Sequence, residues 1–300
     1  MNINEFTALA AEEVLKYFPE DLQDGVKVET SKVMKINDQM LHGLTFVRGE
    51  EPAPTFYLDQ SFEMYQRGAT MEHLMRELAQ AYEHTANAGP EPTEVPDLAF
   101  NKVKRKAGLR LLGMEYNEEF LKTVPYKDVG NGYALICEVQ IKASDGGIFS
   151  TIVNNTMAKE YDYDMEQLFS AALDNAWRTN AASLMPASEL DADMSDEESG
   201  GGQEACYILT TNRQRFGAAA LFYPGTQAMI AHVLKEDYIA IPSSLHEFII
   251  VRKSKAKDPH ILVEFVKEAN QTVVGPEDVL SDCVLVYSKD TRELMRYDAA

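Results

Sequence analysis

The sequence contains few cysteines, and they do not form a motif. Cys137, Cys206 and Cys283 make no CxxC pair, so neither a disulfide framework nor a thiolate zinc site is expected. Each lies in an apolar, strand-like run, where a free cysteine serves as a small core residue. Such cysteine usage is typical of a reducing cytoplasm.

Long apolar runs and basic residues are also scarce. No stretch has the roughly 18 apolar residues that a membrane span requires. The start, Met1-Asn2-Ile3-Asn4-Glu5, lacks the basic and apolar regions of a secretory signal, so we expect a cytoplasmic protein. Lys and Arg number 28 against 48 Asp and Glu, a net charge of −20. The chain has basic stretches at 102–110 and 252–257. The electrostatic field of the net negative charge nevertheless opposes binding to nucleic acid and to anionic membranes.

The remaining composition is that of a globular protein. The chain has 300 residues, of which 45% are hydrophobic and 25% charged, enough for a core and for two domains. Prolines and a glycine among acids at 86–96 indicate a linker. Residues 180–204 hold seven acids and no Lys or Arg, which predicts a flexible loop. We therefore expect α/β lobes at 1–90, 97–180 and 205–300, packed as one or two domains, and an acidic loop at 181–204.

Helical and strand periodicities are both present. Helices are predicted around 4–18, 70–82, 117–124, 164–177, 226–234 and from 258. Strands are predicted at 26–36, 41–47, 55–58, 109–114, 133–141, 148–153, 206–210, 218–223, 238–241, 248–251 and 283–287. The pattern indicates an α+β fold with antiparallel or mixed sheets packed by amphipathic helices. Trp177 ends an apolar helix face, so we expect it to be buried.

One pattern occurs twice along the chain. Phe56-Tyr57-Leu58 leads through an aromatic connector to a helix capped by Thr70, and Ile152-Val153 leads similarly to a helix capped by Asp164. Two such units are consistent with a duplicated strand–helix block. Convergence on a common motif is the alternative.

Four segments resemble one family. They are Pro54–Leu58 with Phe62–Gly68, Leu209–Asn212 with Gly217–Ala220, Ile241–Glu247, and Val279–Asp282. In order and spacing they are similar to the bacterial family known as domain of unknown function 5688. The resemblance implies a cytoplasmic α+β protein of Gram-positive gut anaerobes, often encoded near mobile elements. It implies no reaction.

The first candidate site joins two predicted strands. His246 is a possible general base, Ser243 or Ser244 a nucleophile, and Glu247 its neighbour. However, the GxSxG elbow is missing, and so is the second histidine of HExxH. The alternative, which we favour, is a turn whose Ser and His side chains satisfy backbone groups.

A second candidate is a ligand-binding loop. Asn212, Arg213 and Arg215, followed by Gly217, are suited to a phosphate or carboxylate. The loop matches neither a P-loop nor GxGxxG, and solvated or paired arginines are the alternative.

A third candidate is a helical stripe of His73, Glu77 and His84, spaced for zinc or for a carboxylate–imidazole pair. We favour a solvated face with an i,i+4 pair, and predict neither metal nor cofactor.

Two functions stay open. The leading one is a non-enzymatic cytoplasmic protein that binds another macromolecule, expected to be a protein, through an acidic surface. One form of it is a nucleic-acid mimic that fills the basic groove of a DNA-handling protein, which requires an ordered acidic stripe. The other is a hydrolase-like enzyme that combines 243–247 with 212–217. The oligomeric state does not follow from the sequence.

Overall fold

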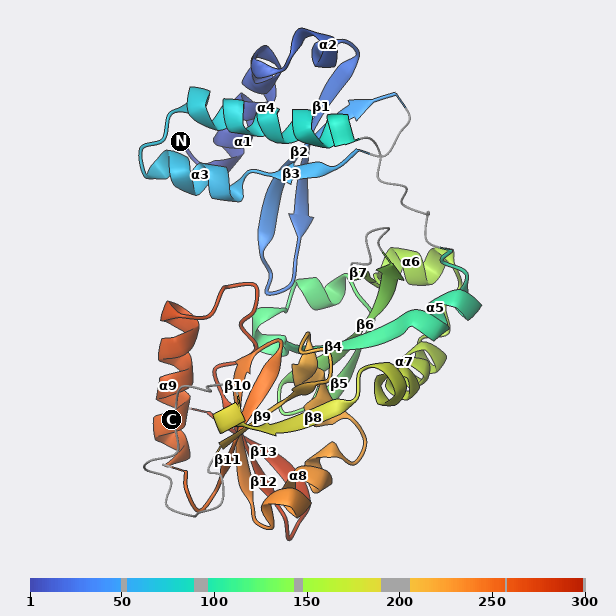
Figure 1. Ribbon diagram of the computed structural model, residues 1–300, viewed down its shortest axis with the longest axis vertical. Coiled ribbons are helices and arrows are strands. Elements are labelled where there is room, and N and C mark those ends of the chain that lie inside the picture. Colours follow the sequence, from blue (N-terminus) through green and yellow to red (C-terminus); the bar gives the residue numbers. More distant parts are fainter. Residues whose placement is uncertain (50–52, 89–96, 143–147, 190–205, 257, 299–300) are drawn as a thin grey trace. The chain divides into compact units, whose positions relative to one another are not determined.

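The computed structural model describes residues 1–49, 53–88, 97–142, 148–189, 206–256 and 258–298. The chain divides into two compact units, Met1–Val95 and Pro96–Ala300, whose helices and strands are labelled in Figure 1. The predicted lobes 97–180 and 205–300 both belong to the second unit. Most of the predicted linker 86–96 and of the acidic loop lies outside the described residues.

The first unit contains a three-stranded antiparallel sheet of order β1-β2-β3. Strands β1 and β2 pair from Val26↔Arg48 to Met34↔Met40. The elements of this unit are α1 (Ile3–Glu13), η1 (Val14–Tyr17), α2 (Glu20–Gln23), β1 (Val26–Met34), β2 (Met40–Arg48), β3 (Thr55–Tyr57), α3 (Asp59–Gln66) and α4 (Met71–Ala88).

The core of the first unit is rich in aromatic side chains. Leu44 and Phe46 on β2 pack with the apolar faces of α1 and α4. Phe18 stacks on Tyr82 at a centroid distance of 4.5 Å and meets Phe46 edge-on at 5.0 Å. Such pairs add about 0.5–1.5 kcal/mol beyond burial of their area. This core fixes α1 over the inward face of β2.

The second unit begins with a four-stranded antiparallel sheet in which β4, β5 and β7 all pair with β6. The amide of Asn175 on α7 donates to the carbonyls of Lys104 and Ala107, where α5 passes into β4. The elements are α5 (Phe100–Lys106), β4 (Ala107–Gly113), η2 (Met114–Tyr116), η3 (Phe120–Lys122), β5 (Tyr126–Gly130), β6 (Tyr133–Lys142), β7 (Ile148–Ile152), α6 (Asn155–Glu160) and α7 (Met165–Thr179).

A six-stranded sheet follows, of order β13-β12-β10-β11-β9-β8. Val263 and Val266 of α9 pack against β10 and β12, so α9 covers this sheet (Figure 1). The elements are β8 (Ala182–Pro186), η4 (Ala187–Glu189), β9 (Cys206–Thr211), η5 (Gly217–Phe222), α8 (Thr226–Leu234), β10 (Tyr238–Ser244), β11 (Glu247–Arg252), α9 (Pro259–Thr272), β12 (Val284–Ser288) and β13 (Glu293–Tyr297).

The α+β class predicted from the sequence is confirmed, with helices packed on antiparallel sheets. The Asp164 carboxylate accepts from the backbone N–H of Gln167 at the start of α7, and Asp258 with Pro259 begins α9. The repeated pattern also has a structural counterpart. β3-α3-α4 and β7-α6-α7 are each a strand, a short helix and a long helix.

The prediction of a buried Trp177 is wrong, because 51% of this residue is exposed. Leu168, Phe169, Ala172, Asn175 and Ala176 form the buried face of α7. Nine residues make two and a half helical turns, which puts position 177 on the opposite side from Leu168. A buried polar residue, Asn175, takes the place that the apolar pattern assigned to the tryptophan.

Three other segments differ from their predictions. Residues 217–222 form a buried 3₁₀ helix instead of a strand, and 117–124 contains the short turn η3 instead of a full helix. A short apolar run does not distinguish a buried strand from a buried helical turn. Residues 182–186, assigned to the loop, instead form β8 at the edge of the six-stranded sheet, paired with β9.

Candidate functional site

The predicted catalytic segment is the tip of the β10–β11 hairpin. The Ser243 hydroxyl donates to the Glu247 carboxylate at 3.2 Å. The backbone N–H of His246 donates to Ser244 Oγ at 3.0 Å, and the carbonyl of His246 accepts from Thr210 Oγ1 at 2.8 Å. Both serine hydroxyls therefore take part in hydrogen bonds that build the turn.

The imidazole of His246 is used in the same way. Its Nδ1 accepts the backbone N–H of Phe216 at 3.0 Å, and its Nε2 lies 3.4 Å from Asp278 Oδ1. The accepting Nδ1 assigns the proton of the neutral ring to Nε2. The only lone pair of the neutral imidazole is therefore engaged by a backbone donor. Within the described residues, His246 contacts Phe216 and Asp278 through its ring, rather than a serine.

Phe216 lies in a strained loop between β9 and η5. Gln214 and Phe216 have φ angles of 53° and 51°, in the left-handed region that side chains other than glycine and asparagine avoid. A Cβ on Gly217 would lie 2.2 Å from Thr210 Oγ1 and 2.6 Å from the carbonyl oxygen of His246. Left-handed backbone conformations such as those of Gln214 and Phe216 cost about 1–3 kcal/mol each, and they persist only where the surrounding structure enforces them. Here β9 and the hairpin tip enforce them.

Beside this loop is a cleft of about 470 Å³. Arg213 donates through Nη1 to Gln140 Oε1 at 2.9 Å, and the Arg215 guanidinium lies 4.9 Å from the centroid of Phe216. The full lining is Glu138, Gln140, Ser150, Asn180, Arg213, Arg215 and Phe216. Two of the three predicted ligand-binding residues therefore lie in one cleft. Asn212 does not line it; it is exposed, and its N–H donates to the carbonyl of Ala181.

A buried ion pair lies behind the cleft. Arg110 Nε contacts Glu138 Oε2 at 2.5 Å, with side chains only 12% and 9% exposed. Arg110 also donates to Ser150 Oγ at 2.8 Å, and its guanidinium lies 3.6 Å from the centroid of Phe216. Burial lowers the pKa of Arg110, and Glu138 opposes that effect. The ion pair therefore fixes one face of the Phe216 ring.

Sequence reasoning missed this ion pair. Arg110 stood in a basic stretch, and Glu138 stood within a buried strand run. The available signal was Glu138 itself, because an acid between Cys137 and Val139 in an apolar strand requires a partner.

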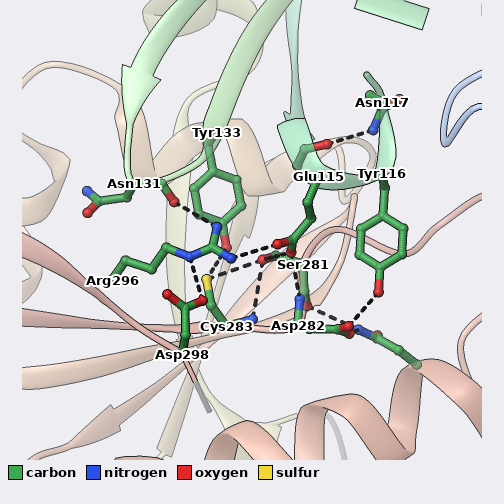
Figure 2. A network of polar contacts seen from close by, with 12 residues as sticks. Glu115, Tyr116, Asn117, Asn131, Tyr133, Ser281, Asp282, Cys283, Arg296 and Asp298 are labelled. Atoms are coloured by element: carbon green, nitrogen blue, oxygen red, sulfur yellow. Dashed lines mark hydrogen bonds and ion pairs between the residues drawn. The ribbon is translucent and has the colours of Figure 1, made fainter. Parts of the chain in front are cut away.

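A second polar network connects the two sheets of this unit (Figure 2). Glu115 accepts from Arg296 Nη2 at 2.6 Å, from Ser281 Oγ at 2.7 Å and from the backbone N–H of Asp282 at 3.1 Å. Tyr116 donates to the carboxylate of Asp282 at 2.7 Å. These bonds join η2, which follows β4, to β13 and to the segment just before β12.

Cys283 lies within this network and is fully buried. The Ser281 hydroxyl is 3.2 Å from its sulfur, and the Tyr133 hydroxyl is 3.5 Å away. Burial raises the pKa of the Cys283 thiol. A thiol kept neutral and inaccessible is a packing group rather than a nucleophile. The network is therefore a clasp between sheets, whereas the cleft beside Arg213 is open to a ligand.

The helical stripe on α4 is largely exposed. His73 Nε2 lies 3.5 Å from Glu77 Oε1, and both side chains are at least half exposed. In the part of the chain that the structure describes, no three His, Cys, Asp or Glu residues are placed to hold a metal ion. Within the same residues, no helix has the length and apolar character needed to cross a membrane.

A single comparison, with protein families, matches nearly the whole chain. Searches of curated proteins and of solved structures found no match. The sequence profile of a family of unknown function, DUF5688, matches residues 3–289. That range includes the strained loop, the hairpin tip and all the residues that line the cleft. The chain belongs to the family of unknown function DUF5688.

Proposed function

We propose that this chain is a binding protein that holds an anionic group, a carboxylate or a phosphate, in the cleft beside Arg213 and Arg215. The observation that carries the proposal is the local charge. Two guanidiniums, those of Arg213 and Arg215, line the cleft, and the one carboxylate that lines it, that of Glu138, is paired with Arg110 behind it. The chain as a whole carries −20, so this cleft has the opposite sign to the protein.

Arg110 and Arg213 have different roles. Arg110 is paired with Glu138 and acts as a support. Arg213 donates to a neutral amide, Gln140, so that hydrogen bond leaves its charge available to an anion. A guanidinium binds a carboxylate or phosphate through two parallel N–H donors, which fixes orientation as well as affinity. Gln140 and Ser150 supply further polar groups in the cleft, and Phe216 supplies an apolar wall.

Strain in the loop supports a binding role. The left-handed conformations of Gln214 and Phe216 reduce stability. Their local effect is to place Arg213, Arg215 and Phe216 around one cleft. Preorganisation of this kind reduces the entropy lost when a ligand binds.

The hydrolase-like alternative is less favoured. A general base needs a lone pair directed at the proton it removes. In His246 that lone pair accepts the backbone N–H of Phe216, and the Ser243 hydroxyl is directed to Glu247. Catalysis by this segment would require the turn to open.

Calorimetric titration of the full chain with inorganic phosphate and, separately, with acetate tests the proposal. The two probes distinguish a phosphate site from a carboxylate site. The Arg213→Gln, Arg215→Gln double variant should bind the preferred anion at least tenfold more weakly. Arg105→Gln, at an exposed position of α5, is the matched control and should bind normally. Equal affinity of the double variant and the wild type would overturn the proposal, as would binding of neither anion.

Binding of a protein partner is the second candidate function. It keeps the expectation, drawn from the acidic composition, that the chain binds another protein. The observation that favours it is α9, where Ile261 and Phe265 are 57% and 60% exposed beside Glu264 and Glu268. Such a face suits a protein segment with apolar anchors and basic flanks. A photoactivatable residue at position 261 should crosslink to such a partner in the native cell. The crosslink should disappear when Glu264 and Glu268 are both changed to Lys. A crosslink that survives this charge reversal contradicts the proposed complementarity.

A further inference from the structure

A buried histidine in the first unit is held on one side only. His42 of β2 is 7% exposed and lies in the inward-facing series with Leu44 and Phe46. Its Nδ1 lies 3.2 Å from Asp59 Oδ1, and its backbone N–H donates to Asp59 Oδ2 at 2.8 Å. Asp59, the first residue of α3, therefore fixes both the position and the orientation of the imidazole.

This contact also sets the chemistry of the ring. With Asp59 accepting the proton of Nδ1, the neutral imidazole keeps its lone pair on Nε2. Among the described residues, Nε2 has no hydrogen-bond partner, and Asp59 is the only side chain that pairs with the ring. Nε2 is not fully enclosed by the protein, so its lone pair is accessible to a ligand.

The imidazole borders an open cavity of about 250 Å³ between α1 and the sheet. Asn4 and Thr7 line it from α1, and Thr30 and Lys32 line it from β1. Lys32 is the direct cross-strand partner of His42 in the β1–β2 register, so both side chains lie on the same face of the sheet. The cavity thus combines an ammonium group, an imidazole lone pair and a side-chain amide.

We propose that this cavity binds a small hydroxy- or amino-carboxylate. The carboxylate pairs with Lys32, and the hydroxyl or amine of the ligand donates a hydrogen bond to Nε2 of His42. Thr30 and Asn4 are further polar groups at the cavity wall. A simple anion leaves the lone pair of His42 unsatisfied, and a neutral alcohol leaves Lys32 unpaired. Only a molecule that carries both groups satisfies the two residues at once.

The sequence signal for this site is a histidine at an inward position of an alternating strand. Met40-Leu41-His42-Gly43-Leu44 places an ionisable side chain among core residues. The site lies within the first unit and shares no residue with the cleft beside Arg213, so the two proposals succeed or fail independently.

The test is an NMR titration of the full chain labelled with ¹⁵N-histidine, in which the signal lost in His42→Gln assigns His42. The probes are glycine, L-serine, glycolate and L-lactate. Acetate and propionate are the matched controls, because they lack the hydroxyl or amine donor. At least one probe should shift the His42 imidazole signals in a saturable way, while acetate and propionate leave them in place.

Lys32→Met should weaken binding of that probe at least tenfold. Lys27→Met is the matched control, because position 27 alternates with 32 and lies on the other face of β1. Lys32 is exposed, so this variant tests the site even if His42→Gln does not fold. The proposal is overturned if no probe shifts the His42 signals, if acetate shifts them equally, or if the two lysine variants bind alike.

Discussion

The backbone N–H of Phe216 donates to Nδ1 of His246 across 3.0 Å, and the two rings lie 5.2 Å apart. This contact connects a residue in the left-handed region to the tip of a hairpin about 30 residues away. It explains how an aromatic residue keeps an unfavourable φ of 51°. The histidine stabilises the loop, and the loop positions Arg213 and Arg215.

Replacing His246 tests this structural role. His246→Ala leaves the Phe216 N–H without its partner, which should lower the free energy of unfolding by about 1–3 kcal/mol. The measurement is a denaturant titration in one buffer. His232→Ala, at an exposed position of α8, should change it by less than about 0.5 kcal/mol. A His246→Ala protein as stable as the wild type would contradict the structural role and favour the hydrolase-like alternative.

Two glycines on β4 should respond in opposite ways to alanine. A Cβ at Gly113 would lie 1.9 Å from the carbonyl oxygen of Leu280, whereas at Gly108 the nearest atoms are side-chain atoms of Glu138 at 3.4 Å. Gly113→Ala should therefore cost about 1–3 kcal/mol, because backbone must move. Gly108→Ala should cost nothing or add up to about 1 kcal/mol. Urea titrations of the two variants decide this, and equal stabilities would be inconsistent with the close approach at Leu280.

The clasp predicts a loss of stability in acid. Burial would raise the pKa of Glu115, but hydrogen bonds from Arg296 and Ser281 outweigh it and hold the pKa below 4.5. A carboxylate with a lowered folded pKa contributes stability above its unfolded pKa, and that stability is lost as the pH falls through the folded value. Glu115→Gln should therefore destabilise the protein at neutral pH, and the deficit should shrink below about pH 4.5.

Unfolding titrations at neutral pH and at pH 3.5 measure the difference. Glu118→Gln, an exposed acid nearby, serves as the control and should change neither value appreciably. If the stability deficit of Glu115→Gln is the same at both pH values, the carboxylate does not carry the interaction.

The single tryptophan gives a direct test of α7. Trp177 is half exposed, while Phe169 on the same helix is buried. The folded protein should show red-shifted emission close to that of the unfolded chain, and Trp177→Ala should cost less than about 1 kcal/mol. Phe169→Ala should cost about 3–5 kcal/mol. Blue-shifted emission, or similar costs for the two variants, would place Trp177 in the core after all.

The class of the fold was predictable because the periodicity of apolar residues is a local property. Helix starts at Asp164 and Asp258 followed from capping chemistry in the same way. The position of Trp177 was not predictable from that pattern, since it depends on which helix face meets β4. The amide of Asn175, which bonds two carbonyls there, decides the face. The apolar pattern assigned the tryptophan to that face because such a pattern counts only apolar residues and leaves a buried polar residue such as Asn175 out.

The sites were predictable only in part. The loop that contains Arg213 and Arg215 can be recognised as a candidate anion site, because charge and loop position are read from adjacent residues. Arg110 and Glu138 are separated by 28 positions in the chain, and the sequence contains nothing that pairs them. His42 and Asp59 are separated by 17 positions, and the pairing of β3 with β2 and the start of α3 bring them together. Contacts of this kind come from topology.

The clasp in Figure 2 has a consequence for synthesis on the ribosome. Glu115 pairs with Arg296, which lies 181 positions further along the chain. Residues 1–95 form a compact unit of their own, in which β1, β2 and β3 pair with one another, whereas β4 and β6 of the second unit are made long before β12 and β13. The second unit can therefore complete its fold only after Arg296 has been made. Before the segment leading into β12 is made, Tyr133 on β6 lacks its neighbour Cys283, and the nascent chain exposes apolar strand surface that favours aggregation or chaperone binding.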